Sequence, residues 1–235
     1  MVIPSTQSDE LALPLPPKPL RVRVGATPDP QKFRQMGTSL AATVTELVAP
    51  LAGKRILEFG CGCGRVLAHS ASIHPEAQWY GIDVDLEAIA WCRKHLADLA
   101  RWEACEEWPP LPFADGTFDT IYQISVFTHL PPDMQLAWLD ELGRVLADDG
   151  MMVVSIYNEV INAILPDSVR SQLEEDGIFY GNDGGTAGLP NSYQSCFHTP
   201  NYVRQSWTKR FEITAWHERA FCHSLDAIVL RKKHK

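Results

Sequence analysis

Three glycines at alternate positions, Gly60, Gly62 and Gly64, follow the apolar residues 56–59 and precede a segment that we expect to be helical. A turn without Cβ atoms lets a ligand touch the backbone and lets the chain adopt positive φ. Nucleotide-type cofactors dock at the carboxyl ends of parallel strands, where such strand-to-helix turns lie. The run therefore predicts a cofactor site of this kind.

Two neighbours of the glycine run bear on which cofactor binds. The dinucleotide fingerprint G-x-G-x-x-G, begun at Gly60, requires glycine at the position of Arg65. The Glu58 carboxylate would repel a pyrophosphate, but it can serve the cationic methionine end of S-adenosylmethionine, directly or through water. These two residues favour S-adenosylmethionine over NAD(P).

Carboxylates also follow the next expected strand, residues 78–82. Asp83 lies at its end and can accept hydrogen bonds from both ribose hydroxyls of a cofactor. NAD sites use an acidic residue at a similar offset, so Asp83 does not discriminate between the two cofactors. Asp85 precedes the helix expected from residue 86, and we interpret it as the N-cap of that helix.

Three further segments support one family. Residues 111–119 read LPFADGTFD, residues 125–130 read SVFTHL, and residues 142–146 read LGRVL with Gly150 four positions later. Together with the glycine run they resemble class I S-adenosylmethionine-dependent methyltransferases of the broad small-molecule type, over about residues 54–156. Residues 20–25, 109–113 and 193–203 look like a bacterial subgroup of this family, some of whose members are associated with glycan or secondary-metabolite pathways.

The resemblance implies a Rossmann-like fold, S-adenosylmethionine as cofactor and a set of cofactor contacts. In the family an acidic residue after the third strand accepts from the adenine amino group. Here that loop offers Cys105 and Glu106, so Glu106 is our choice, with a backbone contact at Cys105 or a solvated surface charge as the alternatives. The predicted cofactor-binding residues are Glu58, Gly60, Cys61, Gly62, Gly64, Asp83, Val84, Cys105, Glu106, Gln123 and Ser125.

Methyl transfer needs few catalytic groups, because the sulfonium leaving group is already activated and alignment of donor and acceptor supplies much of the rate. A base is required only where the acceptor must lose a proton. His129, His198 and Tyr193 are the candidate catalytic residues. For His129 the alternative is a role in the turn before Pro131, and for His198 it is helix capping or packing. Tyr193 belongs with Phe179, Tyr180 and Phe197 to a set of aromatics that would either wall an acceptor pocket or anchor a lid.

The elements expected to position these residues form one α/β domain. Strands alternate with helices from residue 55 to 156, which predicts a mostly parallel sheet with helices on both faces. The last two strands, 211–216 and 225–230, are close enough to pair antiparallel. Residues 1–30 are rich in proline, which we read as an extended arm without regular helix. Residues 31–235 form the methyltransferase domain, with an insert at about 158–198 as a substrate lid.

The net charge, the apolar runs and the cysteines limit which partners and which cellular location we expect. The 235 residues carry a net charge of −8, which disfavours a non-specific nucleic-acid binder. The apolar runs are too short to cross a bilayer, and the first residues lack the pattern of a signal peptide, so we expect a cytoplasmic protein. Six dispersed cysteines are then free thiols, and Cys61 and Cys63 are small turn residues rather than metal ligands. No histidine shows the spacing of a metal ligand.

The leading hypothesis from the sequence is therefore transfer of a methyl group to a small-molecule acceptor, on an oxygen of a metabolite or sugar. Two alternatives remain at this stage. One is an NAD(P)-dependent oxidoreductase, and the other is a cofactor-binding subunit without catalytic activity that stabilises a partner.

Overall fold

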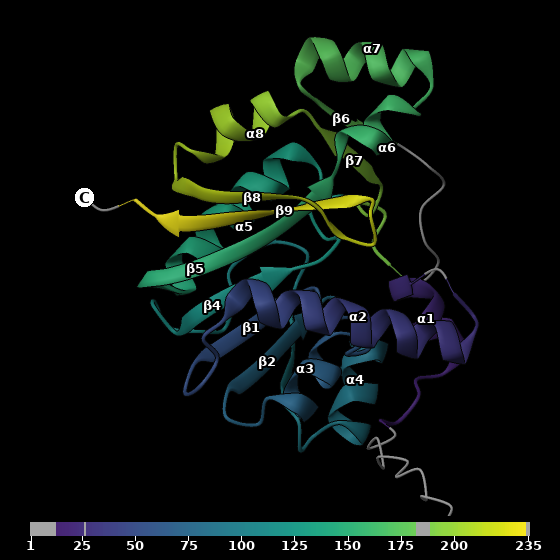
Figure 1. The fold of residues 1–235 in the computed structure, drawn as a ribbon, viewed down its shortest axis with the longest axis vertical. Helices are drawn as coiled ribbons and strands as arrows, with labels where there is room; N and C mark the ends of the chain where they lie inside the picture. The colour runs from purple at the N-terminus through teal and green to yellow at the C-terminus, as the bar shows by residue number, and fades with distance from the viewer. Residues whose placement is uncertain (1–12, 26, 182–188, 234–235) are drawn as a thin grey trace, which may run out of the picture.

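A computed structural model of the protein describes residues 13–25, 27–181 and 189–233 (Figure 1). Its centre is a seven-stranded sheet in the order β3-β2-β1-β4-β5-β9-β8. The strands are β1 (Arg55–Phe59), β2 (Gln78–Asp83), β3 (Arg101–Ala104), β4 (Phe118–Gln123), β5 (Leu146–Tyr157), β8 (Phe211–Phe221) and β9 (Leu225–Lys232). The first five run parallel, and β9 lies antiparallel between β5 and β8. The Rossmann-like architecture expected from the sequence is confirmed.

Alternate residues of the strands face two separate hydrophobic cores. Ile56 of β1 packs into one core with α2 (Pro30–Val48), α3 (Leu67–Ile73) and α4 (Leu86–His95). Its neighbour Leu57 packs into the other with α5 (Pro132–Val145) and α8 (Pro200–Trp207). Figure 1 shows α2, α3 and α4 on one side of the molecule and α5 and α8 with the C-terminal strands. Because both faces are covered, the carboxyl ends of the parallel strands are the place left open for a ligand.

Side-chain caps fix the starts of three helices. Asp85 accepts from the backbone amides of Glu87 and Ala88 at the start of α4, which confirms its capping role. Thr199 accepts from the amide of Tyr202 at the start of α8. Asp29 caps α2 in the same way.

The prediction that residues 1–30 contain no regular helix is wrong, because α1 (Lys18–Gly25) lies within them. Pro19 is the second residue of this helix, where a backbone N–H has no acceptor within the helix, so proline is tolerated. The first backbone bond runs from Arg21 to the carbonyl of Pro17. Residues 1–12 and 26 of the expected arm lie outside the described residues.

The insert is more regular than its sequence indicates. It contains α6 (Glu159–Ala163), α7 (Asp167–Asp176) and β6 (Ile178–Gly181). β6 pairs antiparallel with β7 (Ser195–His198) in a second, two-stranded sheet. Residues 182–188 between these strands are outside the described part of the insert.

The apolar pattern after residue 86 predicts a helix to about residue 100, and Asp149 with Gly150 predicts a turn before the next strand. In the structure α4 ends at His95. β5 begins at Leu146, and residues 147–150 form an irregularity in its pairing with β4. None of the helices within the described ranges is long and apolar enough to cross a membrane.

Candidate active site

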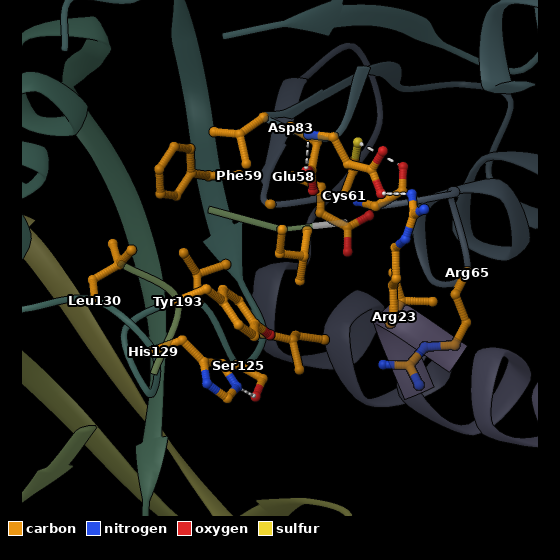
Figure 2. Close-up of a pocket in the computed structure, with 18 of the residues that line it drawn as sticks. Arg23, Glu58, Phe59, Cys61, Arg65, Asp83, Ser125, His129, Leu130 and Tyr193 are labelled. Carbon is orange, nitrogen blue, oxygen red and sulfur yellow. Dashed lines mark hydrogen bonds and ion pairs between the residues drawn. The ribbon is translucent and has the colours of Figure 1, made fainter. Parts of the chain in front are cut away.

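A cavity of about 520 Å³ opens at the carboxyl ends of β1, β2 and β4 (Figure 2). Its wall is built by the end of α1, the middle of α2, the turns after these strands and after β3, the end of β5, the first half of α5, residues 189, 190, 192 and 193 of the insert, and the turn between β8 and β9. Of the residues predicted to bind the cofactor, eight line it: Glu58, Gly60, Cys61, Gly62, Asp83, Val84, Cys105 and Ser125.

The glycine run forms the floor of the cavity and requires its glycines. Gly60 and Gly62 have φ of +79° and +52°, which L side chains rarely adopt. A Cβ on Gly60 would lie 2.2 Å from Cγ2 of Val126, and one on Gly62 would lie 2.1 Å from Cγ1 of Val24. The amides of Gly60 and Cys61 donate to the carbonyl of Ile82 and tie the turn to β2. A cradle of this kind lets a ligand approach the backbone, as the sequence predicts.

Glu58 is a buried acid at the edge of this floor. Its Oε2 accepts from the amide of Leu67, the first residue of α3, and from the hydroxyl of Tyr122. Burial raises the pKa of Glu58 to about 8, although both hydrogen bonds oppose that shift. The group is therefore mainly neutral at pH 7 in the free protein, and a cationic ligand group beside it would favour its ionised form.

Asp83 is held by two backbone amides at the end of β2. Its Oδ2 accepts from Gly62 at 2.6 Å and its Oδ1 accepts from Asp85 at 2.8 Å. Burial raises the pKa of Asp83 above its usual value, while the amide bonds act in the opposite direction. The carboxylate is thus fixed on the cavity wall, where it could accept from ribose hydroxyls. Figure 2 shows Asp83 and Glu58 on the same side of the cavity.

The loop after β3 presents Cys105 and Glu107 to the cavity, whereas Glu106 is exposed and does not line it. The choice of Glu106 as the acidic residue facing adenine therefore does not fit the geometry. Successive residues of an extended loop point to opposite sides, so a shift of one position exchanges the inward side chain. The Glu107 carboxylate accepts from Ser192 Oγ at 2.7 Å.

Two predicted contacts, Gly64 and Gln123, lie behind the wall rather than on it. A Cβ on Gly64 would meet the indole of Trp102 at 2.8 Å, so this glycine permits close packing of core residues. The Gln123 side chain donates to the carbonyl of Ser155 and accepts from the amide of Val126. Gln123 therefore supports the turn that carries Ser125 and does not itself face the cavity.

The cysteines near the cofactor floor are free thiols. Burial raises the pKa of Cys61 well above its usual value and that of Cys105 to about 12, so both stay protonated at neutral pH. Their place in the turns is that of small packing residues.

His129 and Tyr193 come together on the wall opposite Asp83. Their rings stack with centroids 4.0 Å apart, and Nε2 of His129 lies 3.4 Å from Oγ of Ser125. The amide of His129 also donates to the carbonyl of Val126, so the residue takes part in a turn as well. Ser125 has a positive φ of 59°, a strained conformation of the kind found at ligand sites.

His198, the third catalytic candidate, is buried away from the cavity. Its Nε2 lies 2.9 Å from Oε1 of Gln135, and its ring is close to those of Tyr202 and Trp207. Burial lowers the pKa of His198 to about 3, so the imidazole is neutral in the folded protein. This position outside the cavity lining does not fit the predicted catalytic role of His198, and the packing alternative describes it.

The other aromatics of the insert anchor it. Phe197 stacks on Tyr157 with centroids 4.9 Å apart, and the hydroxyl of Tyr180 donates to the carbonyl of Ser192. The amides of Gln194 and Cys196 donate to the carbonyls of His129 and Thr128. The insert is thereby attached to the loop after β4, and Tyr193 alone of this aromatic set lines the cavity.

The sequence reasoning missed two walls. Arg23 at the end of α1 binds Asp85 at 2.8 Å and Glu87 at 2.9 Å, which holds α1 against the cofactor floor. The turn between β8 and β9 contributes Phe221, Cys222 and Leu225. Positive φ values of 51° at Cys222 and 60° at His223 mark this turn as strained. The positive charge of Arg23 is visible in the sequence and could have suggested an ion pair. The turn between β8 and β9 reaches the cavity only because these strands pair with the sheet, which local sequence does not reveal.

Comparisons with known proteins agree with this geometry. Residues 56–150 match the family model of a methyltransferase domain. A fatty-acid O-methyltransferase of Mycolicibacterium smegmatis is 33% identical over 107 residues, which are 45% of this chain and 38% of that protein. A malonyl-[acyl-carrier protein] O-methyltransferase of Legionella pneumophila is 29% identical over 104 residues, 44% of this chain and 36% of that protein. The matches to these two relatives thus span well under half of each relative's length.

Solved structures share the fold over most of the chain. A TehB-like S-adenosylmethionine-dependent methyltransferase from Corynebacterium glutamicum has a TM-score of 0.58 and 18% identity, covering 86% of this chain and 95% of that one. The glycopeptide N-methyltransferase MtfA, in complex with S-adenosylmethionine, has a TM-score of 0.61 and 14% identity, covering 84% and 94%. Together with the glycine floor and the two buried carboxylates, these matches identify residues 56–150 as a class I methyltransferase domain whose cofactor is S-adenosylmethionine.

Proposed function

We propose that the protein transfers the methyl group of S-adenosylmethionine to an oxygen of a small-molecule acceptor, a metabolite or a sugar. One observation carries the proposal. A single cavity has Glu58 and Asp83, the residues that would bind the cofactor, on one side and His129 with Tyr193 on the other. Donor and acceptor bound together there would have their reacting atoms in one enclosed space. Such alignment is the main contribution an enzyme makes to this reaction.

The residues present fit the cofactor group by group. Asp83 would accept from the ribose hydroxyls, and the turn at Gly60 and Gly62 would lie against the backbone of the ligand. Glu58 would face the α-ammonium group of the methionine end. Val84 and Cys105 would border the adenine. The bound cofactor supplies a methyl group on a sulfonium, which is a good leaving group.

The acceptor side is built by His129, Tyr193 and the insert. His129 could take the proton of a hydroxyl acceptor, since its Nε2 is near Ser125 Oγ on the wall of the cavity. The insert, residues 158–198, would act as the substrate wall of a single domain covering residues 31–235. Support for an oxygen acceptor comes from the fatty-acid and malonyl-[acyl-carrier protein] O-methyltransferases among the relatives.

Binding and turnover test the proposal separately. Isothermal titration should detect S-adenosylmethionine and S-adenosylhomocysteine, with NADH as the negative control. The protein would then be incubated with trideuteromethyl-labelled cofactor and a panel of hydroxy and carboxylic acids, phenols and sugars, and products would be sought by mass spectrometry. Absence of binding to either sulfur ligand would refute the proposal. Binding without label transfer to any member of the panel or to a metabolite extract would favour a non-catalytic role.

A further inference from the structure

Arg65 is a buried cation on the cavity wall that the cofactor contacts described above do not use. Its Nε and Nη1 atoms are inaccessible to solvent and have no hydrogen-bond partner among the described residues. Burial lowers the pKa of this guanidinium below its usual value. A guanidinium without an anion beside it is unfavourable in such a place, because the desolvation of its N–H groups is not offset.

The side chain of Arg65 extends into the acceptor side of the cavity. In Figure 2 its guanidinium points toward Ser125 and Tyr193, away from the side that holds Glu58 and Asp83. Nη1 lies against the end of α1, since a Cβ on Gly25 would be only 2.5 Å from it. The groups that interact electrostatically with the guanidinium are Cys222, Glu58, Cys63 and Tyr193.

Three of these neighbours, Gly25, Tyr193 and Cys222, lie outside residues 56–150, the part shared with the methyltransferase domain family. The side chains assigned to the cofactor above, Glu58 and Asp83, lie within that shared part, whereas acceptor contacts come mainly from the elements that differ between enzymes on one fold. The position of the guanidinium therefore points to the acceptor rather than to the cofactor's own carboxylate.

The charge of Arg65 and the residues that line the cavity indicate which kind of acceptor would fit. A single guanidinium matches a carboxylate through two parallel hydrogen bonds. A phosphate dianion fits less well, because Asp83 and Glu58 line the same cavity. The same cavity is also lined by the apolar side chains of Met36, Leu40, Tyr157, Leu189, Phe221 and Leu225.

We propose that Arg65 binds the carboxylate of the acceptor, and that the acceptors are small carboxylic acids with an apolar body. This inference rests on the proposed function, since it assigns a substrate class to the same site. Arg65 is then a specificity-determining residue. It distinguishes an acid from its neutral amide by hydrogen bonds to a charged group.

The test compares acids with their primary amides. Wild-type protein saturated with S-adenosylhomocysteine would be titrated with butanoate, octanoate, dodecanoate and phenylacetate, and with the amide of each. At least one acid should bind about 10- to 100-fold more tightly than its amide. Arg65→Gln should abolish that preference and leave amide binding unchanged, and Arg65→Lys should retain part of it. Arg93→Gln, which removes an exposed arginine of α4 outside the cavity lining, should behave as wild type.

Three outcomes would overturn the inference. One is that wild-type protein binds every acid no better than its amide. Another is that Arg65→Gln keeps the preference for acids. The third is that Arg65→Gln weakens S-adenosylhomocysteine binding as strongly as acid binding, which would assign Arg65 to the cofactor's carboxylate. Titration of wild-type protein with S-adenosylhomocysteine alone separates these from failure of the proposed function, in which case that ligand does not bind and both proposals fall.

Discussion

At the scale of single residues, the buried acid Glu58 connects cofactor binding to pH. Its pKa of about 8 lies above the ordinary value of 4.5, so the free protein carries a neutral carboxyl at pH 7. The α-ammonium of the cofactor favours the ionised carboxylate, so binding should release a proton. The affinity for S-adenosylhomocysteine should therefore rise by up to about tenfold per pH unit below pH 8 and level off above it.

Titration calorimetry in two buffers of different ionisation enthalpy measures this proton release directly. Glu58→Gln should bind more weakly at pH 8 and show a flat pH profile. Glu103→Gln, on the exposed side of β3, is the control and should follow wild type. A wild-type affinity that is independent of pH between 6 and 8 would show that Glu58 does not face the ammonium group.

His198 contributes to stability through its neutral form. The folded pKa of about 3 is below the ordinary value of 6.5, so between these pH values the unfolded chain binds more protons than the folded one. The free energy of unfolding should therefore fall as the pH drops from 6.5 toward 3. His198→Ala should lose about 2–4 kcal/mol at pH 7, because it leaves a cavity and removes the partner of Gln135.

Urea unfolding at pH 7 and pH 5 measures both effects. The loss between these two pH values should be smaller in His198→Ala than in wild type, while the affinity for S-adenosylhomocysteine is kept. His217→Ala, which removes an exposed histidine of β8, should change neither quantity. A selective loss of turnover in His198→Ala at unchanged stability would restore a catalytic role.

The residues that sequence reasoning placed correctly are those whose position follows from the end of a strand. Glu58, Asp83 and Asp85 lie on or just after β1 and β2, so the topology alone brings the first two to the cavity and the third to the start of α4. His198 follows no such rule. Its neighbours Thr199 and Pro200 predict a helix start, but they do not determine which way the preceding side chain points.

At the scale of elements, the turn after β1 requires glycine for two reasons: its positive φ, and the lack of room for a Cβ atom. Gly60→Ala must place a side chain at φ +79° and within 2.2 Å of Val126, which itself lines the cavity. We expect a loss of more than tenfold in affinity for S-adenosylhomocysteine, because the turn and Val126 must both move. The comparison is Gly53→Ala, where φ is +72° and no atom lies within 4 Å of the added Cβ.

Both variants should lose about 1–2 kcal/mol of stability from the left-handed backbone alone. Gly53→Ala should retain full cofactor affinity, which separates backbone strain from obstruction of the site. Calorimetry and thermal unfolding of the two proteins side by side provide the measurement. Equal loss of affinity in both would mean that the glycine floor is not the cofactor cradle.

The elements that the sequence did not reveal depend on contacts distant in the chain. α1 was hidden by the prolines that precede it and by its own Pro19, which is unfavourable inside a helix but compatible with the first turn. β6 is a four-residue strand that exists by pairing with β7 beyond residues 182–188. The turn at Cys222 reaches the cavity because β9 inserts between β5 and β8, a pairing that local sequence patterns indicate only as a hairpin.

At the scale of the whole molecule, the cavity is closed by parts that are far apart in sequence. The methyltransferase core supplies the floor, and α1, α2, the insert and the β8–β9 turn contribute further walls. Ser192 of the insert bonds to Glu107 after β3, and Arg23 of α1 bonds to Asp85 before α4. These polar contacts join α1 and the insert to the core across long stretches of sequence.

The attachment of α1 gives the last prediction. Arg23 is mostly buried, and so is Asp85, with side-chain exposures of 15% and 6%, whereas Glu87 is 65% exposed. The Arg23–Asp85 contact should therefore dominate, and the pair with Glu87 should add little.

Arg23→Gln should accelerate dissociation of S-adenosylhomocysteine about 5- to 10-fold in stopped-flow measurements, with a smaller change in the association rate. Glu87→Gln and Lys18→Gln, both exposed, should leave dissociation near the wild-type rate. An unchanged rate in Arg23→Gln would mean that α1 does not cover the bound cofactor. A slower association with an unchanged dissociation rate would instead assign Arg23 to the entry of the ligand.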